Sequence, residues 1–340
     1  MNKLTKIGAS ALCGSLAAIS SANAGDLTVT GGADMTWISL DDAVTGNPIG
    51  MGSNMTFAGS GELDNGWTVD LSIAHKNAAA YSTTTVTVGV PGLGDFLIIQ
   101  GGSGTGIDRM DDSTPTVWEE AYGTGLSHTM DTVSGASGGA GVEFTPSGTP
   151  DGLTARLSWS PNVDGSGSAD KGGSGASAST GPKGSGWDLT LDASSDLTGM
   201  EGLTIYGGIS QVEVDQTGSS HDDDADERTV GVKYAVGGFT LGYQWSTEDN
   251  GRATTATKYT NDGYGITFAI NDDLTIGYGH YESEQTSTTN VTEEATSIQL
   301  AYTMGGASFR IAESSGDNIG YTTAASGDKD ATTISVGLAF

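Results

Sequence analysis

The chain has 340 residues, a formal net charge of −29 and 54 glycines, and 36% of its residues are hydrophobic. Such acidity argues against nucleic-acid binding, which needs clustered lysine and arginine. The one cysteine, Cys13, lies within a predicted signal peptide, so disulfides, thiolate metal sites and thiol catalysis are excluded from the mature chain.

Residues 1–24 have the pattern of a cleaved secretory signal peptide. Two lysines near the start precede a short apolar run over residues 7–19, and residues 22–24 read Ala-Asn-Ala, a small-residue cleavage site. The apolar run is shorter than the roughly 20 residues that a membrane-spanning helix requires. We therefore expect residues 25–340 to form one exported domain.

From Leu27 onward, apolar and polar residues alternate with a period of two, which is typical of strands with one apolar face. In the first such segment Val29, Met35 and Trp37 share one face, and Asp34 lies on the other. After the signal peptide no apolar run approaches the length of a spanning helix. A polar chain of this kind fits a closed β-barrel that is apolar outside and polar inside.

The alternation predicts sixteen strands, and the links between them are alternately tight turns and longer loops. Long links on one side and short links on the other are typical of barrels in the outer membrane, where the longer loops are external. The predicted strands cover residues 27–37, 51–63, 67–76, 86–90, 95–100, 139–146, 153–161, 187–194, 203–214, 228–236, 239–247, 258–270, 274–284, 295–304, 307–314 and 331–340.

The last predicted strand has Ile334, Val336, Leu338 and Phe340 on one face. An isolated strand at this place would leave an open edge of unpaired backbone groups. We expect it to pair with the first strand and so to close the barrel, with its apolar face toward lipid or a neighbouring subunit.

Three pieces of the sequence resemble the general porins of the Gram-negative outer membrane. They are the cleavage site at residues 22–24, the Gly-Asp-Phe of residues 94–96 that leads into the long third loop, and the closing residues 334–340. The resemblance covers the whole mature chain. It implies an all-β fold, a 16-stranded antiparallel transmembrane β-barrel whose long third external loop folds into the pore.

The resemblance also implies the partners of the chain. They are two further copies in a homotrimer, outer-membrane lipid and lipopolysaccharide, and the barrel-assembly machinery, which reads a closing strand of this type as its signal. On this view the signal residues are Ile334, Val336, Leu338 and Phe340.

The longest break in the alternation, residues 101–138, carries five acidic residues: Asp108, Asp111, Asp112, Glu119 and Glu120. A patch of carboxylates in a narrow pore raises the local concentration of cations and repels anions. We expect this loop to form the constriction; the alternative is a solvated acidic surface loop.

Four basic residues share the polar face of their strands and are predicted to line the opposite wall of the pore. They are Lys76, Arg156, Lys233 and Arg310. Cations that face an acidic loop would set up a transverse field across the constriction, as the resemblance implies.

The sequence favours a passive channel for small hydrophilic solutes and ions that prefers cations. One alternative is a substrate-specific outer-membrane channel, which would need aromatic residues along its lumen. Another is a secreted acidic, glycine-rich β-solenoid or adhesin, which would need a fixed sequence repeat, and we find none.

No nucleophile motif accompanies the four histidines, so we predict no enzyme activity, no catalytic residues and no cofactor. Residues 221–227 have the composition of a Ca²⁺ loop without its ligand spacing, so we predict a solvated external loop there. No defined metal site is expected; at most Ca²⁺ binds loosely to such acidic loops.

Overall fold

The computed structural model describes a large part of the chain. The described residues are 27–40, 48–77, 83–101, 104–130, 132–163, 183–214, 221, 223–251, 258–286 and 290–339. The predicted signal peptide and Phe340 lie outside them. Among the described residues, no helix combines the length and the apolar character needed to cross a membrane.

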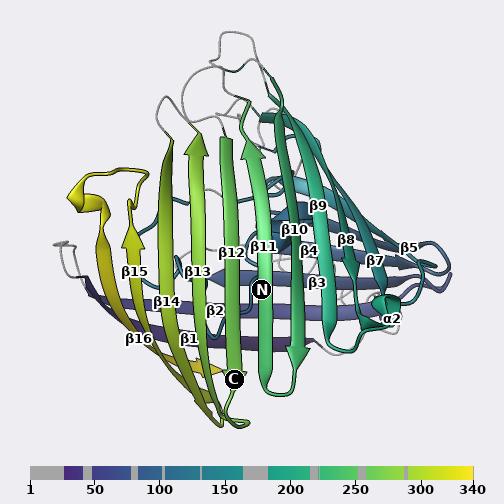
Figure 1. Cartoon of the computed structure of the whole chain (residues 1–340). Helices are drawn as coiled ribbons and strands as arrows, with labels where there is room; N and C mark the ends of the chain where they lie inside the picture. The colour runs from purple at the N-terminus through teal and green to yellow at the C-terminus, as the bar shows by residue number, and fades with distance from the viewer. Residues whose placement is uncertain are drawn as a thin grey trace, which may run out of the picture.

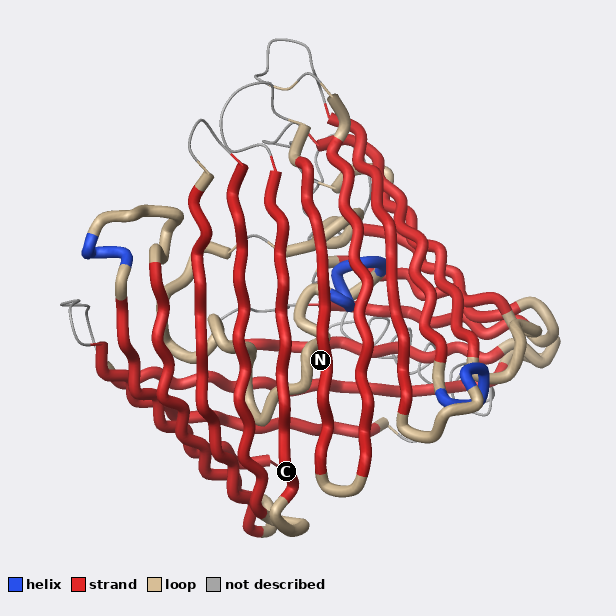
Figure 2. The backbone as a smooth tube through the Cα atoms, viewed as in Figure 1, coloured by secondary structure: helices blue, strands red, loops and turns tan. Residues whose placement is uncertain are grey.

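In the part of the chain that is described, sixteen strands close into one antiparallel barrel, as predicted (Figure 1, Figure 2). Each strand pairs with its neighbours in sequence, and β1 pairs with β16. The strands are β1 (Thr28–Leu40), β2 (Ile49–Glu62), β3 (Thr68–Lys76), β4 (Thr83–Val90), β5 (Gly94–Gln100), β6 (Ala140–Pro146), β7 (Leu153–Ser160), β8 (Lys183–Ala193), β9 (Leu203–Val214), β10 (Ala225–Val236), β11 (Phe239–Asp249), β12 (Lys258–Ala269), β13 (Leu274–Thr286), β14 (Val291–Met304), β15 (Ala307–Asp317) and β16 (Lys329–Ala339).

Within the described residues, three short helical segments lie between strands: η1 (Gly106–Met110), α2 (Ser195–Thr198) and η2 (Ala325–Gly327). Of these, η1 follows β5 and lies in the long break of the alternation, whereas α2 and η2 belong to links between neighbouring strands. Only η1 therefore bears on the predicted constriction.

The closure between β1 and β16 follows the predicted pairing of the last strand with the first. Trp37 lies opposite Ile334, and Met35 lies opposite Val336. Because Ser335 is buried inside, Ile334 points outward, where 42% of it is exposed. The apolar side chains of this strand thus form part of the outer wall.

Several strands extend further toward the longer loops than the alternation predicts. β8, β10 and β14 begin at Lys183, Ala225 and Val291, before the predicted starts at 187, 228 and 295. At these ends polar side chains occur on both faces of the strand, as Asp226 and Glu227 do on β10, so hydrophobic alternation disappears while backbone pairing continues. The prediction of a solvated loop over residues 221–227 is therefore wrong in its second half, which belongs to β10.

The interior of the barrel holds a small apolar core. Tyr122, Leu126 and Met130 of the segment between β5 and β6 pack with Tyr281 of β13 and Ala331 of β16, and all of them are buried. The ring centroids of Tyr122 and Tyr281 lie 4.8 Å apart in an edge-on arrangement. This core anchors the segment against the inner wall.

Candidate functional site: the acidic segment inside the barrel

The segment between β5 and β6 crosses the interior of the barrel. We call its described residues, 104–130 and 132–137, the inner segment. Its hydrogen-bond partners on the wall include residues of β6 (Glu143), β8 (Asp188), β10 (Glu227), β11 (Gln244), β14 (Glu293, Ser297 and Gln299), β15 (Ser314) and β16 (Thr333). Since these strands are distributed around the barrel, the bonds hold the segment inside it.

Buried carboxylates of the wall bind the backbone of the inner segment. Glu227 accepts hydrogen bonds of 2.7 Å from the backbone N–H groups of Ser134 and Gly135. Asp188 accepts from the N–H of Ala136 at 3.0 Å, and Glu293 from the N–H of Thr129 at 3.0 Å. Buried charged groups need such partners, so these bonds position the segment.

Amides and hydroxyls of the wall complete the attachment. The Gln244 side chain donates to the carbonyl of Met110 at 2.6 Å, and the side-chain oxygen of Gln299 accepts from the N–H of Trp118 at 2.9 Å. Thr333 donates to the carbonyl of Thr124 at 3.0 Å. Backbone groups that would otherwise be buried without partners are satisfied in this way.

The sequence did not single out these wall residues as functional. Each lies on the polar face of its strand, which is the one signal that its sequence carries. Polar residues of this face are common in any barrel with a polar lumen, so the pattern does not indicate which of them meet the segment.

Four of the five predicted acidic residues gather in one cluster: Asp108, Asp111, Asp112 and Glu120. Burial is the largest cause that raises the pKa of Asp111 to about 8, followed by the neighbouring carboxyl group of Asp112. Burial and then Asp112 raise the pKa of Glu120 to about 7. The pKa of Asp108 is also raised, chiefly by burial.

Glu119 faces a different part of the wall. Its pKa is raised by burial and by Asp112, and the positive charges of Arg310 and Lys76 oppose that rise. These two basic residues, on β15 and β3, therefore lie near enough to Glu119 for their charges to act on it. The structure brings half of the predicted basic wall to the inner segment at this point.

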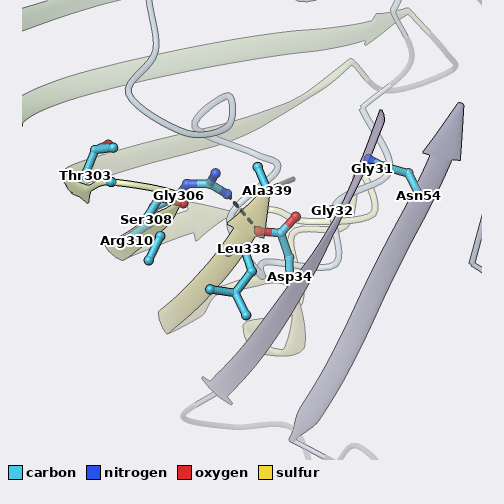
Figure 3. Close-up of a pocket in the computed structure, with 13 residues that line it drawn as sticks. Gly31, Gly32, Asp34, Asn54, Thr303, Gly306, Ser308, Arg310, Leu338 and Ala339 are labelled. Carbon is cyan, nitrogen blue, oxygen red and sulfur yellow. Dashed lines mark hydrogen bonds and ion pairs between the residues drawn. The ribbon is translucent and has the colours of Figure 1, made fainter. Parts of the chain in front are cut away.

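Arg310 has partners of its own on the wall. Its guanidinium lies 3.4 Å from a carboxylate oxygen of Asp34 on β1, in a pocket lined by residues of β1, β15 and β16 (Figure 3). It also lies 5.9 Å from the ring of Trp118 on the inner segment. Gly337 of β16 borders the pair, and a side chain there would collide with Asp34.

The other two predicted basic residues lie on β7 and β10. Arg156 forms an ion pair of 2.5 Å with Asp192, and the ammonium of Lys233 lies 5.4 Å from the ring centroid of Tyr206. A further arginine, Arg109 of η1, is paired with Glu143. Each of three arginines of the lumen therefore has its charge offset by an adjacent carboxylate. The net positive charge of the predicted basic wall is thus smaller than its number of basic residues suggests.

A family model described as Gram-negative porin matches residues 8–340 of the chain. No curated protein matches the sequence at a significant level. Among solved structures, the chain is similar to OmpF of Salmonella typhi in complex with daunomycin, with a TM-score of 0.68 and 12% identity over 93% of this chain and 98% of that one.

Two further structures are similar over almost their whole length. An anion-selective porin from Comamonas acidovorans has a TM-score of 0.65 and 12% identity, with 94% of this chain and 100% of that one covered. The trimer form of OmpT from Vibrio cholerae has a TM-score of 0.62 and 13% identity, with the same coverage. At these identities the likeness shows the fold.

Proposed function

The chain belongs to the Gram-negative porin family and is an outer-membrane porin, and we propose that it forms a passive, water-filled channel for small hydrophilic solutes and ions that prefers cations. The family and the fold are typically those of channels that catalyse no reaction. Ion preference differs between proteins of this fold, since one of the similar structures is an anion-selective porin.

The observation that carries the proposed cation preference is the balance of charge at the inner segment. Asp112 lies close enough to Asp111 and to Glu120 for its charge to raise the pKa of each of them. The arginines that face the lumen are paired with carboxylates of the wall, as Arg156 is with Asp192. Negative charge in a confined aqueous path attracts cations and repels anions.

Reversal potentials in a salt gradient test this proposal directly. At pH 9, where Asp111 is ionised, the triple variant Asp108→Asn, Asp111→Asn, Asp112→Asn removes three charged carboxylates of the cluster, so its ratio of cation to anion permeability should fall several-fold. A matched control removes three exposed carboxylates at the short turns: Asp64→Asn, Glu201→Gln and Asp272→Asn. Anion selectivity of the unaltered protein, or equal ratios in the triple variant and the unaltered protein, would contradict the proposal.

We also propose that the chain acts as a homotrimer, with each copy holding its own pore. The support is that one similar structure is a trimer form. The outward apolar residues Ile334, Val336 and Leu338, together with Phe340, are proposed to serve as the signal for barrel assembly. Outer-membrane lipid and lipopolysaccharide are the proposed surroundings of the remaining outer wall.

A further inference from the structure

A row of carboxylates crosses the outer wall of the barrel on four neighbouring strands. β12, β13 and β14 lie side by side on the near face in Figure 1. The row is formed by directly opposed residues: Asp262 with Glu282, Glu282 with Glu294, and Glu294 with Asp317. Tyr281 and Ser283 are buried inside, so Glu282 between them points outward.

Like charges in directly opposed positions repel one another, because their side chains leave the sheet about 5 Å apart. Among the described residues of β12 to β15, the lysine or arginine that faces outward is Lys258. Its ammonium lies 2.7 Å from Asp249 of β11. Asp262 accepts a hydrogen bond from the hydroxyl of Tyr243. In the part of these strands that the structure describes, the group beside the pair of Glu282 and Glu294 that can carry positive charge is the imidazole of His280, which forms an ion pair with Glu282 when it is protonated.

His280 lies beside this pair and offers a nitrogen ligand. Its Nε2 lies 2.8 Å from Glu282, and one donor atom from each of His280, Glu282 and Glu294 falls within 4.8 Å of the others. Tetrahedral ligands of Zn²⁺ lie about 3.3 Å apart, a separation that small rotations of the two glutamate side chains provide.

The imidazole is already oriented for such a role. Its Nδ1 lies 3.0 Å from the hydroxyl of Thr296, the residue directly opposite His280 on β14. The ring of Tyr264 lies against its other side, with the centroids 4.9 Å apart. A partner on the second ring nitrogen is the usual way in which a metal-binding histidine is held in place.

We propose that His280, Glu282 and Glu294 bind a divalent transition-metal ion of the Zn²⁺ type on the outer wall of the barrel. One imidazole and two carboxylates match the ligand preference of Zn²⁺ and leave one position of a tetrahedral ion open. The ion offsets the repulsion between the paired glutamates and joins β13 to β14.

The location of the site on the outer wall determines what surrounds the open coordination position of the metal ion. Ile276 and Ile298, on the side of the short turns, are exposed apolar residues of the same outer face. Glu282 and Glu294 lie beyond them, toward the longer loops. The site thus lies where the apolar belt gives way to polar residues, at the level of the headgroups, and it faces away from the pore.

Binding of Zn²⁺ alone to the refolded full chain in detergent micelles tests the proposal by calorimetry. We expect one site in the unaltered protein whose affinity falls at least tenfold in His280→Asn and in Glu294→Gln. His75→Asn, which removes another histidine of the wall, is the matched control and should bind as the unaltered protein does. Loss of that site in the control, or its retention in both ligand variants, would overturn the proposal.

A spectroscopic measurement on the unaltered protein avoids any question of how the variants fold. X-ray absorption at the zinc edge of the one-to-one complex should show one imidazole together with oxygen ligands at about 2.0 Å. A shell of oxygen atoms without imidazole would overturn the assignment. Neither measurement depends on conduction, so the site stands or falls separately from the proposed cation preference.

Discussion

Cation preference should rise with pH, because two carboxyl groups of the inner segment ionise near neutrality. The pKa of Asp111 is raised to about 8 and that of Glu120 to about 7. From these values, about 0.1 of a negative charge is present on the two groups together at pH 6 and about 1.9 at pH 9. The rise in pH therefore adds close to two negative charges to the pore.

The expected effect on permeability follows from Coulomb's law. A unit charge about 7 Å from a passing ion in water contributes about 0.6 kcal/mol, or about 0.3 kcal/mol after screening by 0.1 M salt. Two charges favour a cation by about 0.6 kcal/mol and disfavour an anion equally, so the ratio of the two permeabilities should increase about sevenfold.

Reversal potentials in a KCl gradient at pH 6 and pH 9 measure this ratio. The double variant Asp111→Asn, Glu120→Gln resembles the protonated state in shape, so its ratio should stay near the pH 6 value of the unaltered protein throughout. A ratio in the unaltered protein that stays constant or falls between the two pH values would refute the reasoning. So would an equal rise in the double variant, which would assign the titration to other groups.

Three further changes test how the inner segment, the wall and the closing strand work. Glu227→Ala removes the acceptor of two backbone hydrogen bonds, worth about 1.5–3 kcal/mol each. Hydrogen exchange at the backbone amides of Ser134 and Gly135 should therefore accelerate at least tenfold. Unchanged protection of these amides would show that other contacts hold the segment. Asp34→Asn leaves Arg310 without its carboxylate, so the cation-to-anion ratio should fall about threefold, and an increase would contradict the assigned geometry. Deletion of Phe340 should lower the yield of folded barrel in cells, measured by heat-dependent gel mobility, and a normal yield would remove that residue from the proposed assembly signal.

The barrel itself was predictable because one physical constraint is repeated along the chain. Lipid on one face and water on the other impose a period of two on the sequence. The neighbouring residues Ile334, which faces outward, and Ser335, which faces the interior, are an example. The constraint fails at the ends near the longer loops. Asp226 and Glu227 are adjacent polar residues of β10 that face opposite sides, and neither marks the strand by hydrophobicity.

The attachment of the inner segment was not predictable, because it depends on contacts between distant parts of the chain. Glu227 binds residues more than 90 positions earlier, and no local pattern distinguishes it from the acidic residues just before it. The acidic cluster around Asp111 and Asp112 was predictable, because the acidic residues lie close together in the sequence within residues 101–138. The pairing of Arg156 with Asp192 was not, since its geometry arises only when β7 and β8 align.

The attachment of the inner segment has a consequence for the order in which the protein folds. The hydrogen bond from Thr333 to the carbonyl of Thr124 joins residues 209 positions apart, and Glu293 and Gln299 are almost as far from their partners. Such contacts form only after the intervening chain has been ordered. An intermediate that lacks β14 to β16 would still hold both ends of the inner segment through β6, β8, β10 and β11, but its middle, around Trp118, Thr124 and Thr129, would have lost these hydrogen bonds. The final placement of the inner segment is therefore coupled to completion of the barrel.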